Sequence, residues 1–254
     1  TTGGGDIILT VDGDSLTVAA ESQVRTTGRG IAALSSQNAG NSAGLSVEGS
    51  ISADEGTVHL SSDTSVNLLA TDLDEDGNLL PLQMTDRVRT AGDVVITASN
   101  GLRIVDLSGD NTAGTFGRSA SPGVIRIEGN QSIGRNQRLA LQLSGEDDNQ
   151  NDQLQVTGNL TLNSGSGIDI DLANQLQPRL ARSYGVSEAG SVVGHFGSGA
   201  GLFGFDDGSS LLQLTPVIDS TSKTEMGLSL EVVKRPAADT LSIIAHSQAD
   251  KDTL

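Results

Sequence analysis

The fold is decided by the stretch GDIILTV at residues 5–11, followed after a polar turn by LTV at 16–18, because this unit recurs along the chain. The same order of glycine, β-branched run, turn and second apolar run is found in GDVVITA at 92–98 with LRI at 102–104, and in GTVHLS at 56–61 with VNL at 66–68. Looser copies are GVIRI at 123–127 and QLQV at 153–156 with LTL at 160–162. A repeated strand–turn–strand unit is typical of a solenoid, in which one unit buries its apolar face only when a neighbour stacks on it.

The spacing of these short runs predicts the architecture. Expected strand starts at Ile7, Leu16, Val24 and Ile31 lie seven to nine residues apart. Three such strands per turn give coils of about 20 to 25 residues. We therefore predict an all-β fold, a right-handed parallel β-helix. Regular short strands also fit a β-sandwich, but the recurring motif and an aromatic content of only 2% disfavour an ordinary globular core.

The pattern divides the chain into three parts. Solenoid rungs are expected over residues 1–177, with insertions near 72–90 and 106–122. A glycine-rich β region over 178–233 is expected to cap the stack, and 234–254 reads as a linker or tail. The proposed cap holds four of the five aromatic residues, which are Tyr184, Phe196, Phe203 and Phe205. Bulky side chains there would cover the open end of a solenoid.

Charge and composition limit the partners. The net charge of −17 argues against nucleic acid and against anionic membranes, because both would be repelled. The acidic residues fit either solubility of an exposed β structure or cation binding. The chain has no cysteine, so it forms no disulfide, and this fits an exported protein. No segment approaches the roughly 18 apolar residues that span a bilayer, so no membrane insertion by this segment is expected.

The strongest chemical motif is DLDEDGN at residues 72–78. Alternating carboxylates followed by glycine match the first half of a calcium-binding loop. Asp72, Asp74 and Asp76 would coordinate Ca²⁺ by their side chains, and Asn78 by its backbone carbonyl. The twelfth position is Gln83 instead of the usual glutamate, although Asp86 could replace it if the loop folds back. The alternative interpretation is a solvated acidic turn.

Other polar groups carry weaker hypotheses. The cluster Glu146, Asp147, Asp148, Asn149 and Asp152 could bind a cation or form a variable polar loop. Asp169 and Asp171 would share one face of a strand and could supply an acid and a base, although solvent-facing alternation is the common case. The remaining motifs are a formal GxGxxG at 199–204 with no helix expected after it, and three scattered histidines, His59, His195 and His246.

Several segments resemble a known family. The repeated GDIILT unit, LALQLSG at 139–145 with DQLQVTGNLTL at 152–162, and YGV at 184–186 with GSVVGHF at 190–196 are similar to filamentous-haemagglutinin-like and autotransporter passenger β-helices. The resemblance implies a non-enzymatic structural or adhesive segment of a bacterial cell-surface or secreted filament. Such a segment could self-assemble through its ends and bind a cell-surface or matrix receptor. The alternatives are a calcium-dependent binding module and a β-helix carbohydrate-active enzyme.

Overall fold

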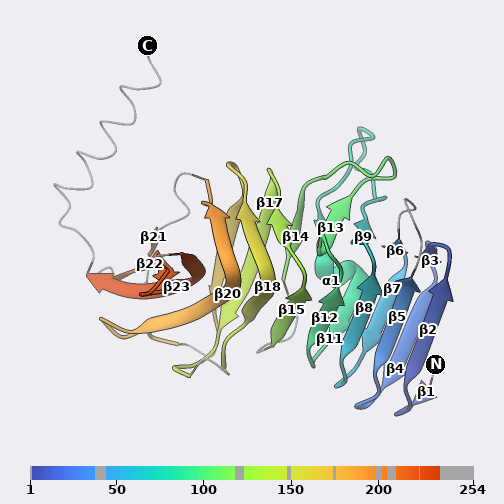
Figure 1. Ribbon diagram of the computed structural model, residues 1–254, viewed down its shortest axis with the longest axis horizontal. Helices are drawn as coiled ribbons and strands as arrows, with labels where there is room; N and C mark the ends of the chain where they lie inside the picture. The colour runs from blue at the N-terminus through green and yellow to red at the C-terminus, as the bar shows by residue number, and fades with distance from the viewer. Residues whose placement is uncertain are drawn as a thin grey trace.

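The chain folds as an all-β parallel solenoid of about six turns in a computed structural model (Figure 1). The structure describes residues 2–37, 44–117, 123–147, 150–173, 176–197, 202–204, 210–222 and 224–234. Parallel pairing between successive rungs confirms the predicted β-solenoid and is not the arrangement of a sandwich built from antiparallel strands. In the described part of the chain the sole helix is α1 (Met84–Arg87), so no helix there is long and apolar enough to cross a membrane.

Four sheets form the faces of the stack. Sheet A contains β1 (Thr2–Gly3), β4 (Gln23–Thr27), β7 (Ser50–Ala53) and β11 (Val88–Thr90). Sheet C contains β3 (Leu16–Val18), β6 (Leu45–Val47), β9 (Val66–Leu69) and β13 (Leu102–Val105). Sheet D contains β10 (Leu82–Gln83), β14 (Gly114–Phe116), β17 (Gln137–Leu143) and β19 (Gly167–Leu172).

Sheet B is the long face that runs through all the rungs. Its parallel part contains β2 (Ile7–Asp12), β5 (Ala32–Gln37), β8 (Val58–Ser62), β12 (Val94–Thr97), β15 (Val124–Glu128), β18 (Gln153–Leu162) and β20 (Ser183–Gly194), and β16 (Gln131–Ile133) pairs with β18. Antiparallel pairing then adds β23 (Glu225–Lys234), β22 (Ser210–Ile218) and β21 (Leu202–Gly204). β20 pairs with both parts, so the sheet is continuous between them.

The sequence repeat corresponds to the register of sheet B. One inward row consists of Ile7, Ala32, Val58, Val94, Ile125, Leu154 and Ser187. Successive members are 25, 26, 36, 31, 29 and 33 residues apart, so most coils exceed the predicted length of 20 to 25 residues. The longer coils contain extra segments between the sheets. Every apolar member after Ile7 is at most 3% exposed.

Glycines stack at the corner before sheet B. A Cβ on Gly56 would lie 1.9 Å from the carbonyl oxygen of Gly30, and one on Gly92 would lie 2.2 Å from that of Gly56. Gly30 has the same relation to Gly5, at 2.5 Å. These approaches are shorter than any ordinary carbon–oxygen contact, so the repeated glycine of the sequence unit allows the rungs to stack at this corner.

The aspartate that follows this glycine links adjacent rungs. The Asp6 carboxylate accepts a hydrogen bond from the Ile31 amide at 2.8 Å, and the Asp93 carboxylate accepts one from the Val124 amide at 3.3 Å. A buried glutamine has a comparable role on the next face. The Gln131 side chain accepts from the Leu102 amide and donates to the Leu102 carbonyl, both at 2.9 Å, so it connects β16 to β13. Side chains thus supplement the backbone ladder between rungs.

Residues 82–90 belong to the stack, although they fall in the predicted insertion at 72–90. Met84 of α1 and Val88 of β11 are buried in the core, at 1% and 3% exposure. Near the other end, Tyr184 and Phe196 are buried in the same hydrophobic cluster. Phe205 and the predicted tail at 235–254 lie outside the described residues.

Candidate functional site

The predicted calcium loop forms the tip of a β-hairpin. Leu73 and Leu79 pair as an isolated antiparallel bridge, and the Asp74 amide donates to the Asn78 carbonyl at 2.9 Å. Gly77 donates its amide to the Asp74 carbonyl and has a φ of +82°. This is the geometry of a type I turn followed by a glycine bulge, which explains the glycine without a metal.

The Asp74 carboxylate closes this tip. Its Oδ1 accepts hydrogen bonds from the backbone amides of Asp76 and Asn78, at 3.0 and 2.8 Å. Hydrogen bonds from the Asn78 backbone and side chain lower the pKa of Asp74, because they stabilise the ionised form. Asp74 and the Asn78 carbonyl, two of the four predicted ligands, are therefore already hydrogen-bonded within the hairpin.

Asp72 and Asp86 contact other groups of the chain. A carboxylate oxygen of Asp72 lies 3.8 Å from a guanidinium nitrogen of Arg87. The Asp86 carboxylate accepts from the Gln83 amide at 3.1 Å, at the start of α1. Among the described residues, no group of three or more histidine, aspartate or glutamate side chains is arranged to hold a metal ion. Calcium binding at Asp72, Asp74, Asp76 and Asn78 stays a prediction.

A second hairpin repeats this construction in the next rung. The Asp106 carboxylate accepts from the Ser108 and Asp110 amides, at 2.8 and 3.0 Å. Gly109 donates to the Asp106 carbonyl and has a φ of +84°. The insertion predicted at 106–122 therefore begins with a hairpin tip like that of 74–78, and its residues 118–122 lie outside the described part of the chain.

The second acidic cluster has a structural arrangement in its described residues. Asp152 is 2% exposed, and its carboxylate accepts hydrogen bonds from the Gly123 amide at 3.0 Å and the Gln142 amide at 2.9 Å. Glu146 forms an ion pair with Arg179 at 2.8 Å. Asp148 and Asn149 are outside the described residues.

The carboxylate pair and the histidines are dispersed over the surface. Asp169 forms a two-point ion pair with Arg138, and Asp171 accepts from the Gln142 side chain at 2.8 Å. Hydrogen bonding to Asp169 raises the pKa of Arg138. His59 lies on the outer face of sheet B, 3.0 Å from the Thr97 hydroxyl, and the ring of His195 contacts the Phe196 carbonyl at 2.8 Å. His246 and residues 199–201 of the GxGxxG motif lie outside the described residues.

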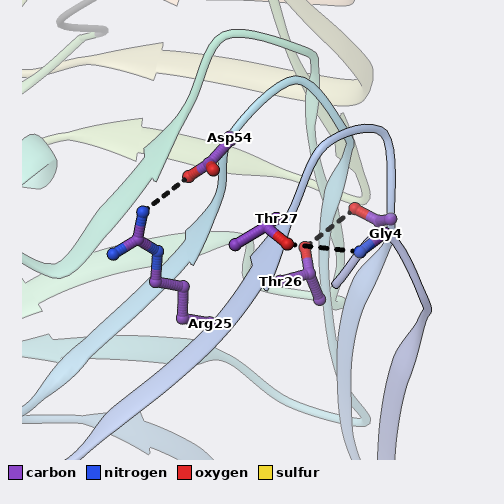
Figure 2. Close-up of polar contacts among 6 residues, drawn as sticks. Gly4, Arg25, Thr26, Thr27 and Asp54 are labelled. Atoms are coloured by element: carbon purple, nitrogen blue, oxygen red, sulfur yellow. Dashed lines mark hydrogen bonds and ion pairs between the residues drawn. The ribbon is translucent and has the colours of Figure 1, made fainter. Parts of the chain in front are cut away.

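A charged hollow lies on the outer face of sheet A. Arg25, Ser52 and Arg89 are in register on β4, β7 and β11, and they line a space of about 530 Å³. Figure 2 shows Arg25 directed at Asp54, with 3.3 Å between the guanidinium nitrogen and the carboxylate oxygen. Arg89 donates to the Thr85 carbonyl at 2.6 Å. Both guanidinium groups in this hollow are thus engaged within the protein.

A larger, mostly uncharged groove lies on the outer face of sheet C. It encloses about 670 Å³, and the row Thr17, Ser46, Asn67 and Arg103 forms its floor. The tip of the second hairpin stands beside it, since residues 106–109 also line the space. The groove is not evident in the sequence, because its residues come from four different rungs. The outward position between two core residues, as in Leu45-Ser46-Val47, is the signal that could have located it.

Comparisons with protein-family models and with curated proteins do not assign the chain to a family. No protein-family model matches this chain, and no curated protein matches it with significant similarity. The resemblance to filamentous-haemagglutinin-like passengers therefore rests on the quoted sequence segments, and what is shown is the β-solenoid fold.

Proposed function

We propose that this chain is an extracellular structural or adhesive segment of a bacterial cell-surface or secreted filament-type protein. The observation that carries the proposal is the continuous parallel stack of about six turns. Such a stack holds outward side chains of successive rungs in straight rows on a stiff support. In the described residues the carboxylates with catalytic potential, Asp169 and Asp171, are each paired with a neighbouring side chain, which supports a non-enzymatic interpretation.

The proposal includes a right-handed coil and a C-terminal cap. Parallel strands of one sheet are joined by right-handed crossovers in nearly all known proteins, and each coil of the solenoid is such a crossover. The cap would consist of the antiparallel strands β23, β22 and β21 with the buried aromatic rings of Tyr184 and Phe196. Antiparallel pairing at this end supports a cap because it ends the addition of parallel rungs on sheet B.

Self-association would use the opposite end, where β2 is an edge strand of sheet B. The Ile7 amide donates to the Ile31 carbonyl just before β5, and the Gly13 amide donates to the Gln37 carbonyl at its end. The alternate amides of Ile8 and Thr10 therefore face away from β5. Ile8 is 71% exposed, and Leu9, in an inward row, is still 42% exposed. An unpaired edge with uncovered core residues is a template for another strand.

The test combines electron microscopy and sedimentation of the purified chain with a cell-binding assay. Thr10→Pro removes an amide that faces the open edge and leaves the pairing with β5, whereas Thr10→Ala keeps this amide and is the matched control. We expect filaments or oligomers that Thr10→Pro reduces and Thr10→Ala does not, together with binding to cell surfaces. A chain that stays monomeric and binds no cells would overturn the proposal.

A further inference from the structure

The polar row on sheet C has a regular spacing along the solenoid. Thr17, Ser46, Asn67 and Arg103 are paired in register on β3, β6, β9 and β13. Neighbouring strands are about 4.8 Å apart, so the row presents one polar side chain at each such step. A linear ligand that lies along the solenoid axis would meet a polar side chain at each rung.

The groove is built with a fixed wall and continues beyond this row. A guanidinium nitrogen of Arg103 donates to the Gly109 carbonyl at 3.0 Å and to the Asn111 side chain at 3.2 Å, which holds the hairpin tip beside the groove. A second hollow of about 200 Å³ shares Asn100 and Arg103 with the first and extends to Thr161. Together the two hollows reach from the first rung to the sixth.

A hydroxyl on the groove floor is available to a ligand. Ser46 is 7% exposed as a residue and lines the groove, and its hydroxyl is not one of the side-chain atoms that are fully buried without a partner. A ligand that brings a polar group to Ser46 would form a hydrogen bond there.

The charges of the groove select an uncharged ligand. Among the lining residues the ionisable side chains are Arg103 and Asp106, and both already hold the hairpin through hydrogen bonds. The remaining polar lining consists of hydroxyl and amide groups, which each donate and accept hydrogen bonds. The net charge of −17 also disfavours an anionic ligand.

We propose that this groove binds a neutral, extended oligosaccharide along the solenoid axis. The inference rests on the proposed adhesive function and names the class of ligand. A saccharide fits better than a peptide strand, because the face of sheet C offers side chains while its backbone groups are paired within the sheet. Leu107, 73% exposed at the hairpin tip, provides an apolar contact for a sugar ring. The described residues that line the groove include no aromatic side chain, so single-site affinity is modest and binding gains from multiple copies.

The test measures binding of neutral gluco-, manno- and galacto-oligosaccharides of graded length, free and on beads, to the purified chain. Ser46→Ala removes the hydroxyl on the groove floor and should weaken binding about tenfold, the equivalent of one hydrogen bond, without lowering thermal stability. Ser35→Ala is the matched control, because it makes the same change at a serine that lies on sheet B and lines neither hollow. We expect this control to bind like the wild type, and affinity to rise with chain length.

Three results would overturn the inference. These are no binding by any neutral oligosaccharide, equal binding by wild type and Ser46→Ala, or tighter binding of an oligogalacturonate than of the neutral panel. The proposed function fails separately. If the chain binds cells and self-associates but binds no oligosaccharide, only the proposal of a saccharide groove is overturned. If it does none of the three, the proposed adhesive and structural function is overturned as well.

Discussion

Glycine at the corner before sheet B shows how a single residue determines the stack. A Cβ at Gly56 would meet the Gly30 carbonyl at 1.9 Å, so Gly56→Ala forces two rungs apart. We expect a loss of about 1–3 kcal/mol in the free energy of unfolding, measured by denaturant titration. Gly197→Ala is the control, because its nearest contact is 3.3 Å, and it should cost clearly less. Equal effects of the two substitutions would show that the corner tolerates a side chain.

The lowered pKa of the Asp74 carboxylate makes its contribution to stability depend on pH. Its pKa is lowered from the ordinary value of 3.8 by hydrogen bonds from Asn78. Because the pKa is lower in the folded state, the stabilisation by this carboxylate is complete at a pH above its unfolded-state pKa. It is lost as the pH falls through the folded-state pKa. Carbon-detected NMR titration should therefore give Asp74 a midpoint below 3.8, and Asn78→Ala should raise it. A midpoint at the ordinary value would contradict the hairpin geometry.

At the scale of the element, the two acidic hairpins have the same closure. Their tips are closed by backbone hydrogen bonds and by Asp74 or Asp106. We expect the amide signals of Gly77 and Asn78 to keep their hairpin shifts in EDTA, and their loss in EDTA would contradict this. The calcium prediction is tested in the same samples. Millimolar Ca²⁺ should shift signals near Asp72 and Asp76 in the wild type and not in Asp76→Asn.

The join between β13 and β16 depends on a side chain. Gln131 is 3% exposed and satisfies both the amide and the carbonyl of Leu102. Gln131→Leu would leave these two groups without their partner, so we expect a loss of about 2–4 kcal/mol in the free energy of unfolding. Gln155→Leu, at an outward position of sheet B, should change stability by less than about 0.5 kcal/mol. Comparable losses would mean that the Leu102 groups find other partners.

Some of these elements could be predicted from the sequence, and others could not. Strands that carry the repeated glycine and β-branched run, such as β2, β8 and β12, were predicted correctly because each copy has the same neighbours. Residues 72–78 were harder to interpret, since alternating carboxylates before a glycine suit both a metal loop and a hairpin tip. The groove on sheet C was not predicted, because adjacency between Ser46 and Asn67 arises only from coil length, and coil length varies from 25 to 36 residues.

For the whole molecule, stacking predicts a gradient of local stability. Each rung contacts mainly its neighbours, so end rungs have fewer stabilising interfaces than central ones. We expect hydrogen–deuterium exchange to be fastest in β2, where Leu9 is 42% exposed, and slowest in β8 and β12, where Leu60 and Ile96 are fully buried. Uniform protection across these strands would instead indicate a single cooperative unit.

The rung-to-rung pairing has a mechanical consequence. Because the strands run across the solenoid, the hydrogen bonds between rungs lie parallel to its long axis. A force applied along this axis at the β2 end acts on the hydrogen bonds of one strand before those of the next, so the coils unfold one after another. Each coil of 25 to 36 residues would release about 80 to 120 Å of extended chain. A segment of this kind would lengthen stepwise under tension and absorb a pull before its other end is detached.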